Sequence, residues 1–132
     1  MNQSFFSKRI GRLEYFVFLA VPYVLIMLIG VFQNILYSKF QVEIINVLFQ
    51  FVHYFYYFWL ILFIVLSIKR LHDYNLNGFY ILIPIILGIV AGVLISGFVN
   101  SLVLFLSVAI FSLKKGTVGP NNFGEDPVTV RV

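Results

Sequence analysis

The segment Lys69–Tyr80, with the sequence KRLHDYNLNGFY, concentrates chemistry in a chain that is otherwise mostly apolar. Its first five residues place two cations, a histidine and a carboxylate next to one another. Arg70 precedes Asp73 by three residues, so on a continuing helical turn the two side chains share a face and can pair. His72 and Asp73 could instead form a catalytic pair, but such a pair also needs a nucleophile or a metal nearby. We therefore favour an arginine–aspartate clasp that fixes a loop.

Two other segments combine polar side chains with turn-forming residues. Residues 8–16, KRIGRLEYF, precede the first long apolar run and carry three of the cations. Residues 114–127, KKGTVGPNNFGEDP, are rich in Gly, Pro and Asn, so they predict a succession of turns. Phe123 is a lone aromatic residue in this polar stretch, and two acidic residues follow it. Because the other two segments offer cations, we expect this tail to dock on them.

The residue types exclude several kinds of chemistry. The chain has no cysteine, and its two histidines, His53 and His72, lie too far apart in the sequence to give a zinc-binding pattern. We therefore expect no metal and no other cofactor, and we assign no catalytic residue. The net charge is +4, but no basic helix face alternates with aromatic residues, so a nucleic-acid partner is not expected.

The elements that position the polar segments are predicted to be membrane-spanning helices. Of the 132 residues, 61% are hydrophobic and 11% are charged, whereas soluble domains carry about 25% charged residues. The length suits one domain, residues 1–132. The basic residues before the first apolar run resemble the start of a signal peptide. However, that run is long and no A-x-A cleavage pattern follows it, so a spanning helix is the better interpretation.

The apolar runs predict four crossings of a bilayer whose hydrocarbon core is about 30 Å thick. Residues 79–113 contain no charge and would form one helix of about 52 Å, which is too long for a single crossing. Gly97 and Asn100 favour a break within residues 96–101. The predicted crossings are residues 15–37, 44–68, 79–96 and 98–113, followed by a cytoplasmic tail, residues 114–132.

The basic residues give the orientation. With four crossings, both termini and the central loop lie on one side, which carries eight of the nine lysines and arginines. By the positive-inside rule that side is the cytoplasm. The expected fold class is therefore all-α, a polytopic four-helix transmembrane bundle with both termini cytoplasmic. The three polar segments then share one membrane face, where they can meet.

The predicted spans contain no Asp, Glu, Lys or Arg, although pathways for protons and ions usually contain such residues. The strongest polar candidates inside the spans are Asn34, Asn46, Gln50, His53 and Asn100. Of these, Gln50, His53 and Asn100 in particular could line a transport path. The third span also contains GIVAG, residues 88–92, whose two glycines let helix backbones approach closely. This motif could serve packing within the bundle as well as a dimer.

The three polar segments, in this order, resemble the motifs of the bacterial membrane family called domain of unknown function 805. The matching residues are Arg9, Arg12, Glu14, Tyr15, Arg70, Leu71, His72, Asp73, Gly78, Phe79, Tyr80, Gly116, Thr117, Gly119, Pro120, Asn121, Phe123, Gly124, Asp126 and Pro127. The chain departs from the pattern at Lys8, Lys69 and Asn77, and a lysine at 69 keeps the charge of an arginine without its bidentate geometry. The resemblance implies a multi-helix bundle in the inner membrane, and it implies no activity.

Three functions follow as hypotheses, with the bilayer as the common partner. The first is a binding or scaffold protein whose cytoplasmic cluster holds an anionic group, either a lipid phosphate or an acidic segment of a protein, because arginine suits such groups. The second is a small transporter or channel acting as a homo-oligomer. The third, less favoured, is a membrane enzyme that uses His72 and Asp73 on a lipid-linked substrate. The candidate binding residues are Arg9, Arg12, Arg70, His72, Asp73, Asn121 and Asp126.

Overall fold

The computed structural model describes residues 9–40 and 43–125, and for these the prediction of an all-helical chain is confirmed. Four α-helices and one short 3-10 helix form, and no β-strand occurs in these two ranges beyond an isolated bridge between Asn121 and Gly124. In chain order the elements are α1 (Arg12–Phe40), α2 (Glu43–Asp73), η2 (Gly78–Ile81), α3 (Leu82–Leu94) and α4 (Gly97–Leu113).

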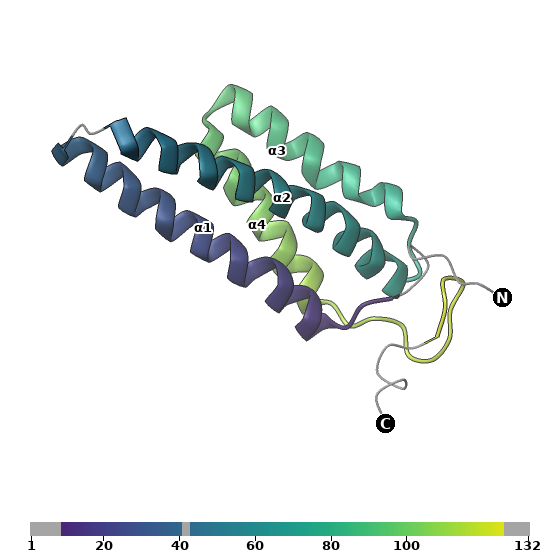
Figure 1. Ribbon diagram of the computed structural model, residues 1–132. Helices are drawn as coiled ribbons and strands as arrows, with labels where there is room; N and C mark the ends of the chain where they lie inside the picture. Colours follow the sequence, from purple (N-terminus) through teal and green to yellow (C-terminus); the bar gives the residue numbers. More distant parts are fainter. Residues whose placement is uncertain (1–8, 41–42, 126–132) are drawn as a thin grey trace.

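The helices form two antiparallel hairpins that pack together (Figure 1). α1 packs along α2, α3 packs along α4, and α4 also contacts α1 and α2. From their residue numbers, α1 and α2 are about 44 and 46 Å long, whereas α3 and α4 are about 20 and 26 Å long. The start of α1, the end of α2 and the end of α4 lie at one end, where residues 114–125 fold beside them (Figure 1). We call this the clasped end.

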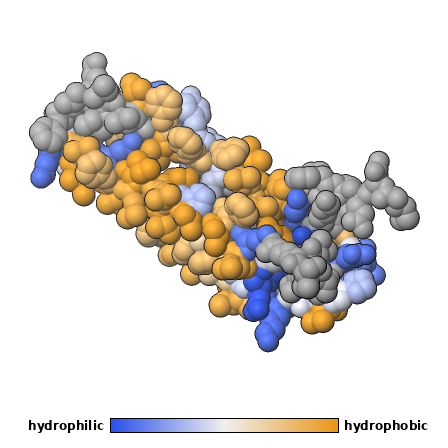
Figure 2. Space-filling view, turned by 60° about the horizontal axis from the view of Figure 1, so that its bottom comes forward, coloured by the Kyte–Doolittle hydropathy of each residue, from blue (hydrophilic) through white to orange (hydrophobic). Residues whose placement is uncertain are grey.

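Two helices are long and apolar enough to cross a membrane, over Arg12–Lys39 and Phe49–Asp73. The apolar stretches Gly78–Leu94 and Gly97–Leu113 are shorter. Large apolar side chains on all four helices are exposed, and Figure 2 shows them as a hydrophobic surface with hydrophilic residues toward its two ends. Two spanning helices are thus supported by length and composition, while four crossings and cytoplasmic termini stay predictions.

The core between the hairpins is built from aromatic side chains. Tyr23 stacks on Phe105 of α4 with 4.8 Å between ring centroids, and it lies 4.9 Å from Trp59 of α2. The Trp59 indole donates a hydrogen bond to the Leu19 carbonyl at 2.8 Å, so its polar group is satisfied inside the apolar core. Of the aromatic block 54–59, Trp59 is buried, whereas Tyr54, Phe55, Tyr57 and Phe58 are more than half exposed.

The turn after α2 is closed by local hydrogen bonds that fix the clasped end. The Tyr74 and Leu76 amides both donate to the Leu71 carbonyl at 3.0 Å, and Asn75 adopts a left-handed conformation with φ 59°. Asparagine tolerates this conformation, which commonly ends a helix. Asn77 then caps η2, because its side chain accepts a hydrogen bond from the Phe79 amide at 3.1 Å.

The turn between α3 and α4 lies at Ile95 and Ser96, whereas Gly97–Ser101 of the predicted break belong to α4. Ser96 starts the helix because its hydroxyl accepts a hydrogen bond from the Val99 amide at 3.4 Å. Gly88 and Gly92 of α3 both face Asn100 of α4: a Cβ at Gly92 would lie 2.9 Å from the Asn100 Cβ. The small-residue motif therefore packs the hairpin itself.

Replacing Gly92 with leucine is expected to destabilise the protein by about 1–3 kcal/mol, because the added side chain must push α4 away from α3. Thermal unfolding in detergent, followed by circular dichroism, measures the effect. Gly30→Leu is the matched control, since Gly30 is also within a helix and a Cβ there meets nothing within 4 Å. Equal midpoints for the two variants would contradict close packing at Gly92.

Candidate functional site

The three polar segments meet at the clasped end, around the carboxylate of Asp73. One carboxylate oxygen accepts a hydrogen bond from Arg9 Nε at 2.8 Å and lies 2.7 Å from Arg9 Nη2. The other oxygen accepts a hydrogen bond from Arg70 Nη1. All three side chains are almost completely buried, with 1–3% of their surface exposed. Asp73 at the end of α2 thus joins its own helix to the segment before α1.

Arg9 also holds the tail. Its Nη1 donates hydrogen bonds to the carbonyls of Gly119 at 2.6 Å and Gly124 at 3.5 Å, and its Nη2 donates to the carbonyl of Thr117. Every nitrogen of the guanidinium group therefore has a partner within the protein. This arrangement accounts for the burial of an arginine, because its donors are satisfied and its charge is paired.

Arg70 joins α2 to the end of α4 and to the segment just before α1. Its Nε donates to the Phe111 carbonyl at 3.0 Å, its Nη2 to the Lys114 carbonyl at 2.6 Å and its Nη1 to the Ile10 carbonyl at 3.1 Å. The last carbonyls of a helix lack partners within the helix, so Arg70 supplies donors that α4 itself cannot. The pairing of Arg70 with Asp73 is the clasp that the sequence spacing predicts.

The tail is bonded along its length to the end of α2. The Thr117 amide and hydroxyl both donate to the Asp73 carbonyl, at 2.8 and 3.0 Å. The Asn121 side chain donates to the His72 carbonyl at 2.9 Å, and the Phe123 ring stacks on the His72 imidazole with 4.0 Å between centroids. Residues 114–125 are thus docked, which also gives the lone aromatic residue of this segment a partner.

Tyr74 is a member of this site that the sequence analysis missed. Its hydroxyl donates to the Phe111 carbonyl, and the Arg70 guanidinium carbon lies 4.7 Å from its ring centroid. Burial raises the pKa of the Tyr74 hydroxyl, which favours the protonated form that donates this hydrogen bond. Its only sequence signal is its place directly after the KRLHD cluster. The carbonyl groups that Arg70 contacts have no sequence signal, because every residue type carries one.

The structure brings most of the predicted site residues together. Arg9, Arg70, His72, Asp73 and Asn121 lie in this one connected cluster. Arg12 is exposed in the first turn of α1, and no hydrogen bond of its side chain is found to residues 9–40 or 43–125. Asp126 lies outside the described residues. Both oxygens of Asp73 are occupied by arginines, and no cluster of His, Cys, Asp or Glu suited to a metal occurs in the described part of the chain.

The polar candidates for a transport path come from two helices, with Gln50 and His53 on α2 and Asn100 on α4. His53 is exposed, and its Nδ1 lies 2.7 Å from the Phe49 carbonyl of its own helix. Gln50 is exposed as well, while Asn100 packs against the two glycines of α3. In the described ranges no hydrogen bond links any two of these three side chains.

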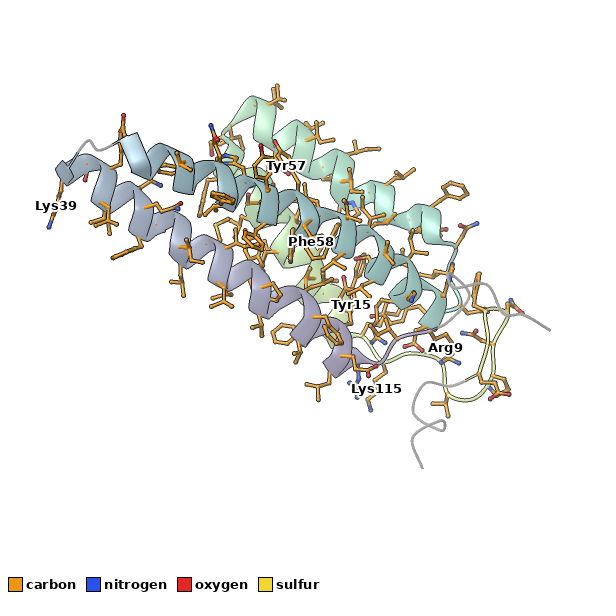
Figure 3. All side chains as sticks on the ribbon, in the orientation of Figure 1. Arg9, Tyr15, Lys39, Tyr57, Phe58 and Lys115 are labelled. Carbon is orange, nitrogen blue, oxygen red and sulfur yellow. The ribbon has the colours of Figure 1, made fainter. Side chains whose placement is uncertain are left out.

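Among residues 9–40 and 43–125, three exposed cations border the clasped end: Arg12, Lys114 and Lys115, which we call the basic rim. Figure 3 shows Lys115 at the end of the bundle where α1 begins, with Arg9 nearby and Lys39 at the opposite end. Beside this rim lies a groove of about 580 Å³. Its walls are residues 11–14 and Phe16 from the start of α1, and Ala109, Ser112 and Leu113 from the end of α4.

Comparisons with known proteins agree with the resemblance seen in the polar motifs. No curated protein and no solved structure matches the chain. One family does match, over residues 4–125, a range that includes all the segments of the clasp. Because this match covers nearly the whole chain, the protein belongs to the family described as "Protein of unknown function (DUF805)".

Proposed function

We propose that this protein is a multi-pass inner-membrane binding protein that holds a phosphate-bearing anionic group at the basic rim of its clasped end. The observation that carries the proposal is that the arginines differ in their contacts. Arg9 and Arg70 donate their hydrogen bonds to Asp73 and to backbone carbonyls, and these bonds fix the end of the bundle. Arg12, Lys114 and Lys115 remain exposed beside it.

The membrane placement is supported by the surface of the helices. Large apolar side chains such as Leu28, Phe58 and Ile86 are more than half exposed, and extensive exposed apolar surface is typical of contact with a membrane. Because α3 starts at the clasped end and α4 returns to it, four crossings would place both termini on one side (Figure 1). The excess of basic residues at that end favours the cytoplasm.

The rim suits a phosphate because its cations are exposed, and one of them, Lys114, is anchored on the clasped end. Lys114 lies with its Nζ 4.9 Å from the Tyr74 ring centroid, and its own carbonyl is held by Arg70. Ordering the Lys114 side chain around an anion therefore costs less entropy than ordering a lysine without such contacts. An acidic segment of a partner protein offers carboxylates instead of phosphates and is the alternative ligand that the test must distinguish.

The double variant Arg12→Gln/Lys115→Gln is expected to bind glycerophosphate roughly tenfold more weakly than the wild type, because each substitution removes a charge-assisted contact. Isothermal titration of the full chain in a non-ionic detergent measures this. Lys39→Gln is the matched control, since Lys39 is an exposed cation at the opposite end.

The proposal fails if the wild type shows no saturable binding of glycerophosphate, or if the double variant binds it as tightly as the wild type. A polyglutamate peptide provides the comparison for carboxylate ligands. Tighter binding of that peptide, lost in the double variant, would assign the rim to an acidic protein segment and overturn the choice of phosphate.

A further inference from the structure

The groove beside the basic rim combines an apolar trough with a cationic edge. Leu13 and Leu113 line it on opposite sides and are 76% and 80% exposed, and Phe16 continues the apolar wall along α1. Ala109 contributes only a methyl group, which leaves space between the two helices. Arg12 lines the same groove, and Lys114 and Lys115 follow Leu113 directly.

This combination matches an amphiphile with a negatively charged head. A ligand without an apolar part would leave the Leu13, Phe16 and Leu113 surfaces uncovered, and an uncharged lipid would leave the cations without a partner. The volume of about 580 Å³ is in the usual range for small-molecule sites, and it holds a phosphate together with part of one acyl chain. Basic side chains at the ends of membrane helices commonly reach the phosphates of lipids.

Two other grooves on the helices provide a comparison within the molecule. One, of about 260 Å³, lies between α1 and α4 farther from the clasped end, and the other, of about 290 Å³, lies between α3 and α4. Neither has a charged residue in its walls. They can accept acyl chains but offer nothing to a head group. The groove beside the basic rim also has an acidic residue in its wall, Glu14. The Glu14 side chain has an interaction within the protein, and its Oε2 lies near Gly11.

We infer that the groove between the start of α1 and the end of α4 binds one anionic phospholipid. The phosphate lies against Arg12 and Lys115, and one acyl chain runs between Leu13 and Phe16 on one side and Ala109 and Leu113 on the other. The inference rests on the proposed function, because it names the molecule that carries the phosphate. It adds one requirement to the proposed function, namely that an acyl chain of the lipid occupies the groove.

Native mass spectrometry of the full chain, stripped of lipid in detergent and titrated with dioleoyl phosphatidylglycerol, tests this directly. Wild type is expected to take up one lipid before any further molecules bind, and to prefer it to dioleoyl phosphatidylcholine. Ala109→Trp fills the groove and should weaken this first binding step roughly tenfold, as should Arg12→Gln. Ile110→Trp is the control, because it puts the same side chain on the neighbouring position, which lines the α3–α4 groove.

Leu113→Gln provides a second variant that does not depend on how the core tolerates tryptophan. Its side chain is 80% exposed, so the change removes apolar wall without opening the core, and it should also weaken lipid binding. The outcomes separate the two proposals. If Ala109→Trp and Leu113→Gln bind phosphatidylglycerol like the wild type while Arg12→Gln does not, the rim binds phosphate but the groove holds no chain, and the inference falls alone.

If all variants and the wild type bind both lipids equally, the lipid inference is overturned. If glycerophosphate also fails to bind the wild type, the proposed function falls with it. In the expected case, Ala109→Trp binds the lipid more weakly but binds glycerophosphate like the wild type, because tryptophan blocks the apolar trough and leaves the cations in place.

Discussion

Replacing Asp73 with asparagine is expected to destabilise the protein by about 3–5 kcal/mol, because two buried guanidinium groups would lose the carboxylate that neutralises them. An asparagine side chain has a similar shape, but its amide group would place donors against the donors of Arg9 or Arg70. The thermal midpoint in detergent, followed by circular dichroism, measures the loss. The effect exceeds that of most point substitutions because the removed charge is shared by two partners.

Glu125→Gln is the control for the Asp73 substitution. Glu125 is an exposed acid in the same docked tail, so removing its charge should change stability by less than about 0.5 kcal/mol. A double-mutant cycle with Arg9→Gln adds a second check, since side chains in one network give non-additive effects. Additive effects of Asp73→Asn and Arg9→Gln would show that the two residues act independently and would contradict the clasp.

Replacing Gly116 with alanine is expected to release the tail from the bundle. A Cβ at this position would overlap one oxygen of the Asp73 carboxylate and lie 2.7 Å from the other. The carboxylate cannot move aside, because both oxygens are held by arginines. The tail must therefore shift, with a cost of about 1–3 kcal/mol that is typical of overpacking at a tight site.

Amide hydrogen exchange gives the sharpest measure of this release. The Thr117 amide donates to the Asp73 carbonyl at 2.8 Å, so it should exchange slowly in the wild type and at least tenfold faster in Gly116→Ala, while the helices keep their protection. Gly97→Ala is the matched control, since a Cβ there meets nothing within 4 Å. Unchanged exchange at Thr117 in Gly116→Ala would show that Gly116 does not approach Asp73 as the structure describes.

The Gly116→Ala substitution also separates the stability of the clasped end from lipid binding in the groove. Gly116→Ala disturbs the tail that begins beside Lys114 and Lys115, whereas the groove walls come from α1 and α4. Lipid binding in the groove depends on those helices, so it should survive release of the tail in part, with Arg12 intact and Lys115 displaced. The clasp is thus expected to set the geometry of the rim without itself contacting the bound anion.

Some features of the site followed from the sequence because they are local. Arg70 and Asp73 are three residues apart on a helix, which is enough to predict their pairing. The lengths of the uncharged apolar runs predict the helices, because a segment inside a bilayer finds no water there. Its backbone groups must bond to one another, and a helix allows this within one segment. The distribution of charges predicts that the three polar segments share one end of the bundle. In the structure, Arg9 and Arg70 both donate hydrogen bonds to the Asp73 carboxylate at that end.

Only the tertiary structure decided what the arginines do. The sequence offers Arg9, Arg12 and Arg70 alike as candidate binding residues, because an arginine suits phosphate in each case. Arg9 and Arg70 instead bind backbone carbonyls of residues more than forty positions away, such as Gly119 and Phe111, whose oxygens leave no mark in a sequence. The groove is of the same kind: Ala109 and Arg12 become neighbours because α4 packs on α1, and an open space between helices depends on side chains from both. Local spacing determined the pairing of Arg70 with Asp73, and long-range packing decided which cations stay exposed.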